Sequence, residues 1–142
     1  MGKILIVEDD LVTQKLISAM LDKQGHTTFI SPNGRHAMET LQVNYFDLMI
    51  TDVMMPELDG RELITAIRKY PRLGNMPVII ISAVIRASDV MELLKHGATY
   101  FIPKPLSKDQ VIEYVNLSLE ELEQKKARAA KEARAAKEAK AG

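Results

Sequence analysis

Short hydrophobic runs alternate along the chain with longer segments in which hydrophobic residues recur every three or four positions. Five of the short runs are rich in β-branched or aromatic residues, which is typical of strands: residues 4–7, 26–31, 47–51, 76–83 and 99–103. In the segments between them, hydrophobic residues share one helical face, as Leu16, Ile17 and Met20 do. The pattern therefore predicts five strands that alternate with five helices.

Capping residues define the ends of several predicted helices. Asp10 precedes the first helix, Asp59 precedes the third with Glu62 three residues later, and Ser107 precedes the last. Gly25 follows the first helical pattern and Gly97 follows the fourth, where glycine commonly ends a helix. We expect helices to begin and end at these positions.

Strict alternation of strands and helices implies parallel strands joined by right-handed crossovers. The predicted fold class is α/β, a doubly wound five-stranded parallel sheet with helices on both faces, which makes a three-layer sandwich. Pro103 lies in the fifth strand, and because proline cannot donate a hydrogen bond to a sheet, that strand is predicted at an edge. Sites in such sheets form beyond the carboxyl ends of the strands.

The last residues differ in composition from the rest. The hydrophobic face of the final helix ends at Leu122, and the sequence ARAAKE then occurs twice in succession, over residues 127–132 and 133–138. Alanine, arginine, lysine and glutamate are strong helix formers, but alanine is the only hydrophobic residue of the repeat and supplies no coiled-coil seam. We expect a domain over residues 1–124 and a solvated, fraying helical tail over residues 125–142. The identical repeat leaves open whether the tail is natural.

Composition and charge narrow the possible partners. The chain has 142 residues, 46% of them hydrophobic, and its 19 basic residues balance its 19 acidic ones. This balance gives no reason to expect direct binding to nucleic acid or to a membrane surface, although the tail is basic and the body mildly acidic. Cysteine is absent, and the apolar run near the start is too short for a signal peptide. A cytoplasmic location is the expectation.

Polar residues lie at or just beyond the carboxyl ends of four predicted strands. Glu8 and Asp9 follow the first strand, Asp52 follows the third and Lys104 follows the fifth, while Ser82 stands near the carboxyl end of the fourth. Two carboxylates roughly 5 Å apart repel by about 3 kcal/mol at an effective dielectric near 20, and a bound cation removes that conflict. Oxygen ligands without cysteine or a nearby histidine favour a hard ion, so Mg²⁺ is the predicted cofactor.

These groups suit phosphoryl transfer. An aspartate can act as the nucleophile when cations neutralise the charge of the transferring group, and Asp52 is placed to be that acceptor. Lys104 supplies a positive charge and Ser82 a hydroxyl for the phosphoryl oxygens. The backbone carbonyl of Met54 is available to complete the metal sphere. Each residue alone is weak support, because strand-end acids are more often helix caps or solvated charges.

At this point the chain resembles the receiver domain of bacterial two-component response regulators, of the chemotaxis-regulator type. The matching pieces are ILIVEDD, DLMITDVMMPELDG, VIIISA and YFIPKP, and the resemblance covers about residues 3–122. It implies a flavodoxin-like strand order of 2-1-3-4-5 and a cis peptide before Pro105. It also implies Asp9 as a direct metal ligand, Glu8 as a ligand through water and Asp52 as the phospho-acceptor.

The resemblance further implies a signalling switch. A sensor histidine kinase or phosphotransfer protein would supply the phosphoryl group, and Ser82 and the aromatic Phe101 would respond to it. The output face would comprise the fourth helix, fifth strand and fifth helix, with Val90, Met91, Phe101 and Val111. It would bind a downstream protein or a second copy of the chain. Such a protein is no conventional enzyme, because it catalyses only its own phosphorylation and dephosphorylation.

Two other functions remain open from the residues. A receiver-shaped scaffold could signal through protein contacts without phosphate, although every expected site residue is present. A phosphohydrolase with an aspartate nucleophile is a more remote alternative, because it needs a second aspartate two residues later, where Met54 stands.

Overall fold

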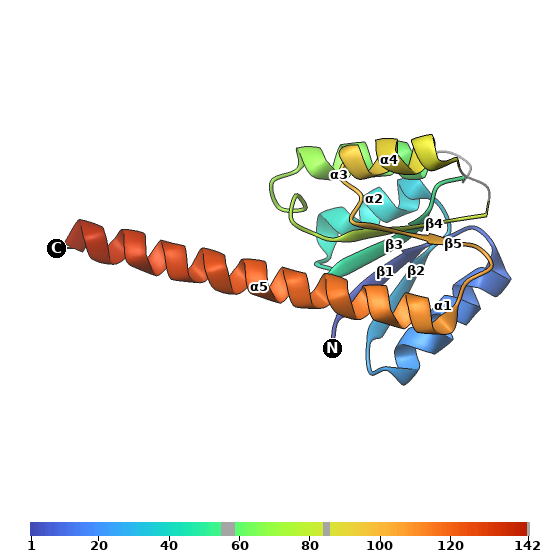
Figure 1. Cartoon of the computed structure of the whole chain (residues 1–142), viewed down its shortest axis with the longest axis horizontal. Coiled ribbons are helices and arrows are strands. Elements are labelled where there is room, and N and C mark those ends of the chain that lie inside the picture. Colours follow the sequence, from blue (N-terminus) through green and yellow to red (C-terminus); the bar gives the residue numbers. More distant parts are fainter. Residues whose placement is uncertain (55–58, 84–85, 142) are drawn as a thin grey trace.

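The fold is one parallel sheet of five strands, seen in a computed structural model that describes residues 1–54, 59–83 and 86–141. The strand order is β2-β1-β3-β4-β5, as expected from the resemblance. The strands are β1 (Lys3–Val7), β2 (Thr27–Ser31), β3 (Leu48–Asp52), β4 (Val78–Ser82) and β5 (Tyr100–Pro103). β5 lies at an edge, which confirms the prediction made from Pro103 (Figure 1).

Helices cover both faces of this sheet. They are α1 (Leu11–Lys23), α2 (Gly34–Val43), α3 (Gly60–Lys69), α4 (Ala87–Lys95) and α5 (Lys108–Ala141). One buried cluster joins the sheet to α2, α3 and α4, and contains Leu41, Ile64 and Leu93. A second cluster on the other face contains Ile17 of α1 and Val115 of α5. The predicted three-layer architecture is therefore confirmed (Figure 1).

The predicted caps are present. The Asp10 side chain accepts a hydrogen bond from the Thr13 amide, and the Asp59 side chain accepts one from the Glu62 amide. Gly25 and Gly97 have φ angles of 89° and 118°, a left-handed conformation that suits glycine beyond a helix end. Local sequence chemistry therefore fixes where these helices begin and end.

α5 continues well beyond the globular body. It is a single helix of 34 residues, and its last buried residue is Leu122. Residues 123–141 are all exposed, and they project away from the sheet as the orange-to-red helix in Figure 1. No helix in the described part of the chain is both long enough and apolar enough to cross a membrane.

Candidate functional site

Three charged side chains meet at the carboxyl edge of the sheet. Glu8 follows β1, Asp52 ends β3 and Lys104 follows β5. The Lys104 Nζ lies 2.6 Å from Asp52 Oδ2 and 3.1 Å from Glu8 Oε1. One ammonium group therefore holds two carboxylates that are 44 residues apart in the sequence and belong to neighbouring strands.

Burial sets the electrostatics of this cluster. Glu8 is 1% exposed and Asp52 is 6% exposed. Burial raises the pKa of Glu8 to about 7, and the adjacent Asp52 carboxylate adds to this rise while Lys104 opposes it. Burial acts to lower the pKa of Lys104, but its bonds to Asp52 and Glu8 outweigh burial and the pKa is raised. The cluster therefore holds more negative charge than one lysine neutralises.

Glu8 itself is incompletely satisfied. Its Oε2 atom is buried and has no hydrogen-bond partner within the described residues. Its backbone carbonyl accepts a bond of 2.6 Å from the side-chain amide of Gln14, a buried polar residue on α1. Sequence reasoning missed Gln14, although a glutamine three residues before the core residue Ile17 was a usable signal. An unpaired buried carboxylate oxygen marks a place for a cation or water.

The Asp52 carboxylate is oriented by its own loop and by Lys104. The Met54 amide donates to Asp52 Oδ1 at 3.0 Å, while Oδ2 faces Lys104. The Thr51 hydroxyl donates to the Asp52 backbone carbonyl at 2.9 Å. Asp52 is thus held at a fixed position with both carboxylate oxygens engaged.

A close backbone approach brings α3 against this loop. Gly60, the first residue of α3, donates its amide to the Val53 carbonyl at 3.0 Å. A Cβ atom at Gly60 would lie 2.6 Å from the Asp52 carbonyl oxygen and 2.8 Å from the Val53 Cα. These are backbone atoms that cannot rotate away, so only glycine fits. This role was also missed from the sequence.

Ser82 and Lys104 are joined through the backbone. The Lys104 amide donates to the Ser82 carbonyl at 2.8 Å, and Ser82 is 2% exposed. The peptide bond between Lys104 and Pro105 is cis, as the resemblance implied. The structure therefore brings Ser82 to the same edge of the sheet as Asp52.

Asp9 behaves differently from the other predicted acids. It is exposed, and no group of three Asp, Glu or His side chains in the described part of the chain is gathered tightly enough to hold a metal ion. The donor set still fits a hard cation, because it consists of carboxylates and includes the unpaired oxygen of Glu8. The structure brings Glu8 and Asp52 together but leaves Asp9 outside their contact.

Comparison with known proteins agrees with the fold. The profile of the response regulator receiver domain matches residues 4–116. The chain belongs to the receiver-domain family of response regulators. Its role is accordingly that of a regulatory domain of two-component signalling.

Individual relatives support this membership. A protein of Leptolyngbya boryana described as "Uncharacterized 14.6 kDa protein in sodA1 3'region" is 34% identical over 79% of this chain and 86% of its own length. The "Probable transcriptional regulator ycf29" of Pyropia yezoensis is 32% identical over 80% of this chain, but this receiver domain spans only 51% of it. The receiver domain of the Francisella response regulator 1452 is 32% identical, with a TM-score of 0.80 and coverage of 85% and 98% of the two chains.

The expected output face is only partly at the surface. Phe101 of β5 is half-buried and packs against the cluster that contains Leu93 of α4. Met91 is 59% exposed, which suits a docking face. Val111 was wrongly assigned to this face, because it is 1% exposed and lies on the buried side of α5 beside Val115.

A second charged side chain is enclosed at the opposite edge of the sheet. The guanidinium of Arg68 donates to the carbonyl oxygens of Gly97 at 2.6 Å, Met76 at 2.7 Å, Gly74 at 2.9 Å and Leu73 at 3.3 Å. Burial lowers the pKa of Arg68. The side chain thereby ties the end of α3 to the segments that lead into β4 and β5.

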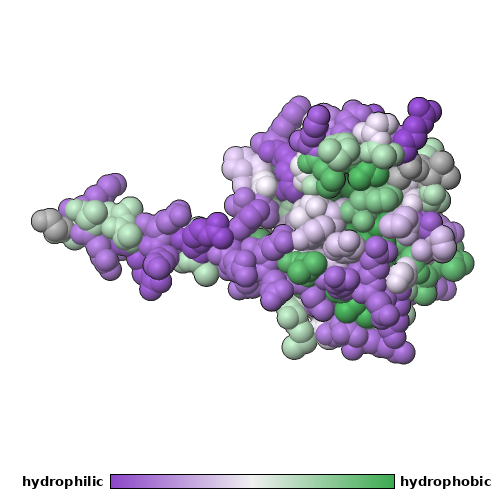
Figure 2. All heavy atoms as spheres, viewed as in Figure 1, coloured by the Kyte–Doolittle hydropathy of each residue, from purple (hydrophilic) through white to green (hydrophobic). Residues whose placement is uncertain are grey.

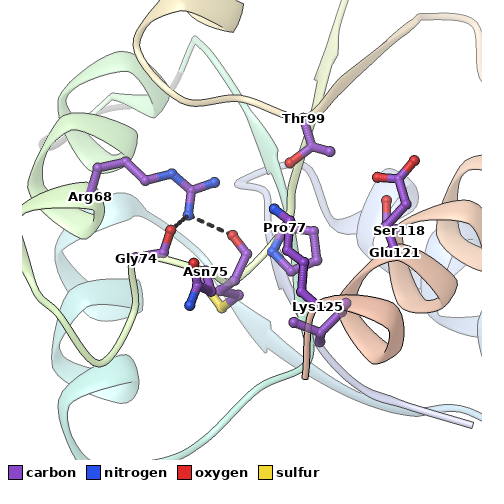
Figure 3. A pocket seen from close by; sticks show the side chains of 10 residues that line it. Arg68, Gly74, Asn75, Pro77, Thr99, Ser118, Glu121 and Lys125 are labelled. Carbon is purple, nitrogen blue, oxygen red and sulfur yellow. Dashed lines mark hydrogen bonds between the residues drawn. The ribbon is translucent and has the colours of Figure 1, made fainter. Parts of the chain in front are cut away.

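Beside Arg68 lies a small polar cavity of about 50 Å³. Figure 3 shows Arg68 and Gly74 on one side, with Thr99, Ser118 and Glu121 on the other. Such a volume suits one or two water molecules rather than an organic ligand. The cavity therefore belongs to the structural framework and is far from the carboxylate cluster.

Proposed function

We propose that this receiver domain is a phosphorylation-dependent switch that accepts a phosphoryl group on Asp52 from a histidine kinase or a phosphotransfer protein. The observation that carries this proposal is the contact of 2.6 Å between Lys104 Nζ and Asp52 Oδ2 beside the buried Glu8. A lysine placed there can bind an oxygen of a phosphoryl group attached to Asp52.

In the proposed transfer, a carboxylate oxygen of Asp52 attacks the phosphorus atom of a phosphohistidine. The new O–P bond forms as the P–N bond breaks, and the electron pair of that bond returns to the imidazole of the donor. Lys104 then moves its contact from the carboxylate to a phosphoryl oxygen. The Met54 amide, which donates to Asp52 Oδ1, keeps the carboxylate oriented during attack.

Mg²⁺ is the proposed cofactor, and when bound it would neutralise charge on the phosphoryl oxygens. Asp9, Asp52 and the Met54 carbonyl would hold it directly, with Glu8 acting through water. The unpaired Oε2 of Glu8 supports this assignment, because a cation or its water would satisfy a buried oxygen that the described protein groups do not. The exposed position of Asp9 leaves it accessible from solvent.

The proposed signal passes from Asp52 to the α4–β5–α5 face. Ser82 lies next to Lys104 in the hydrogen-bonded pair of β4 and β5, so its hydroxyl can reach the same phosphoryl group. Phe101 lies three residues before Lys104 on β5 and packs under α4. Movement of Ser82 towards the phosphate would let Phe101 pack more deeply and change the surface that a downstream protein meets.

The test is the intact mass of the protein after incubation with acetyl phosphate and Mg²⁺. We expect one phosphoryl adduct on the native chain, none with Asp52→Asn and none after chelation of Mg²⁺. Asp47→Asn is the matched control, because it also removes a carboxylate at an end of β3 but should leave the adduct. If the native chain gains no adduct and also fails to bind beryllofluoride, the phosphate-independent scaffold becomes the better description.

A further inference from the structure

A groove lies at the amino edge of the sheet, where α5 leaves the globular body (Figure 1). Its volume is about 450 Å³, which is within the usual range of small-molecule sites. Three separate segments form its walls: residues 45–47 before β3, residues 72–76 before β4 and residues 122–129 of α5. The groove is therefore at the opposite end of the sheet from Asp52.

The floor of this groove is apolar. Phe46, Met76 and Leu122 line it, and their side chains are 8%, 6% and 8% exposed. Tyr45 also lines the groove, but it is 69% exposed. A flat apolar molecule in the groove would exclude water from the floor and cover part of the Tyr45 ring.

Positive charge surrounds the apolar floor. Arg72, Lys125 and Lys126 line the groove, and among the described lining residues Asp47 is the one acid. Asp47 is already engaged, because its Oδ2 accepts a bond of 2.8 Å from the Lys3 amide and its Oδ1 lies 3.8 Å from Lys126 Nζ. The groove thus has an excess of positive charge beside an apolar surface.

Arg72 and Lys125 are held in different ways. The guanidinium carbon of Arg72 lies 4.7 Å from the centre of the Tyr45 ring, and the guanidinium donates to the Leu41 carbonyl. These two contacts fix Arg72 as a cationic wall of the groove. Lys125 makes no ion pair with any residue that the structure describes, so its ammonium group is available to an anion.

We propose that this groove binds a small amphipathic anion, with a flat apolar or aromatic body and one carboxylate, sulfonate or phosphate group. The body packs on Phe46 and Met76, and the anionic group lies near Lys125 and Arg72. A neutral ligand would leave the excess positive charge without a partner, and a cation would be repelled. This site goes beyond the proposed phosphorylation and does not depend on it.

Other occupants fit the groove less well. Residues 1–124 carry 12 basic and 17 acidic residues, so the body repels a long polyanion such as nucleic acid, whereas a small anion meets mainly the cations of the groove. Figure 2 shows the projecting part of α5 covered mainly by hydrophilic residues. A helix that lies on a membrane needs one apolar face, which such a surface does not provide. The apolar floor and the charge together favour a small anion.

The test is a titration of the full chain with naphthalene sulfonate, followed through the backbone amide signals in heteronuclear NMR spectra. We expect saturable shifts confined to residues 45–47, 72–76 and 122–129, with a dissociation constant of about 1 mM or lower. The neutral naphthalene methanol has the same ring system and should bind at least about fivefold more weakly. Inorganic sulfate at equal concentration should give no such shifts, because it cannot cover the apolar floor.

Variants separate the groove from the general charge of α5. Lys125→Glu should raise the dissociation constant for naphthalene sulfonate by about fivefold or more, because an acid replaces the available cation. Lys131→Glu is the matched control, since it makes the same change further along α5 and outside the groove, and should alter the constant by less than about twofold. Tyr45→Ala should weaken the binding of both naphthalene probes. Asp52→Asn should bind naphthalene sulfonate as the native chain does, so failure of this site and failure of the proposed phosphorylation are distinguishable.

The proposal is overturned by the absence of saturable shifts in the groove or by shifts centred on α4 and β5. Equal affinity for the neutral and anionic probes would overturn it, as would equal effects of Lys125→Glu and Lys131→Glu. Binding of polyglutamate in the groove without binding of naphthalene sulfonate would also overturn it, because the occupant would then be an acidic polypeptide.

Discussion

Each end of the sheet holds a partly buried, positively charged side chain, but the groups that bind it differ: neutral carbonyls at one end and carboxylates at the other. At the amino edge, four backbone carbonyl oxygens accept hydrogen bonds from Arg68. At the carboxyl edge, Lys104 bridges Glu8 and Asp52, and one oxygen of Glu8 has no partner among the described residues. Every N–H of Arg68 in these contacts has an acceptor, whereas the second arrangement leaves one buried carboxylate oxygen without a hydrogen-bond donor among the described residues.

The difference indicates that the Arg68 contacts serve the stability of the fold, whereas the carboxylate cluster is suited to binding. Backbone carbonyl groups are neutral and fixed in place, so their hydrogen bonds to Arg68 stabilise the fold and need no ligand to complete them. At the other edge, two acids and one lysine leave an excess of negative charge in a buried place. This excess of negative charge destabilises the protein without a ligand. It favours the binding of a cation, or of a group that gives Lys104 a further hydrogen-bond acceptor.

The largest loss of stability is expected from removing the Arg68 side chain. Arg68→Ala leaves the carbonyl oxygens of Gly74, Met76 and Gly97 without their donor, and should lower the free energy of unfolding by about 3–5 kcal/mol. The Leu73 carbonyl keeps its bond from the Met76 amide. Arg61→Ala is the control, because Arg61 is exposed and pairs with Glu92 only at 3.8 Å, so its loss should cost below about 0.5 kcal/mol. Urea unfolding measures both. Similar costs for the two variants would contradict a structural role for Arg68.

A smaller effect is expected where α3 meets the Asp52 loop. Gly60→Ala forces a Cβ to within 2.6 Å of the Asp52 carbonyl and should destabilise the fold by about 2–3 kcal/mol. It should also slow adduct formation with acetyl phosphate, because Asp52 is displaced. Gly74→Ala is the control, since its Cβ would meet neighbours at 3.6 Å, an ordinary contact. Equal stability of the two variants would show that the close contact between α3 and the backbone of Asp52 and Val53 does not require glycine at position 60.

The smallest effect depends on pH. The pKa of Glu8 rises from 4.5 to about 7 on folding, so the stability it contributes is full below 4.5 and is lost as the pH rises through about 7. With Mg²⁺ chelated, the native chain should therefore be less stable at about pH 8 than at about pH 5, and Glu8→Gln should recover about 1–2 kcal/mol at the higher pH.

The control for this pH effect is Glu39→Gln, which alters an exposed glutamate of α2. Thermal unfolding across the pH range measures all three proteins. A native chain whose stability does not fall between these pH values, or a Glu8→Gln variant with the same pH dependence as the native chain, would contradict a buried excess of negative charge.

Much of the fold followed from local sequence patterns. Alternating strands and helices, Pro103 at an edge and the caps at Asp10 and Asp59 depend on short stretches of chain, and all were confirmed. The meeting of Glu8, Asp52 and Lys104 also followed, because parallel strands bring their carboxyl ends to one edge.

What the sequence did not reveal depends on packing between distant segments. Arg68 binds Gly97, which lies 29 residues away, and Gly60 is needed only because α3 approaches the Asp52 loop. Val111 was misplaced because the whole fifth helix was assigned to a surface, whereas its period already placed this residue on the buried side. The exposed position of Asp9 depends on loop conformation, which residue type does not determine.

The most direct test of the central claim is to locate the phosphoryl group. After phosphorylation by acetyl phosphate, borohydride reduction converts an acyl phosphate into a stable alcohol that tandem mass spectrometry can assign to one residue. We predict reduction at Asp52, in the tryptic peptide of residues 36–61. Reduction confined to the peptide of residues 4–15, which holds Glu8 and Asp9, or reduction at Asp47 or Asp59 alone, would contradict Asp52 as the acceptor.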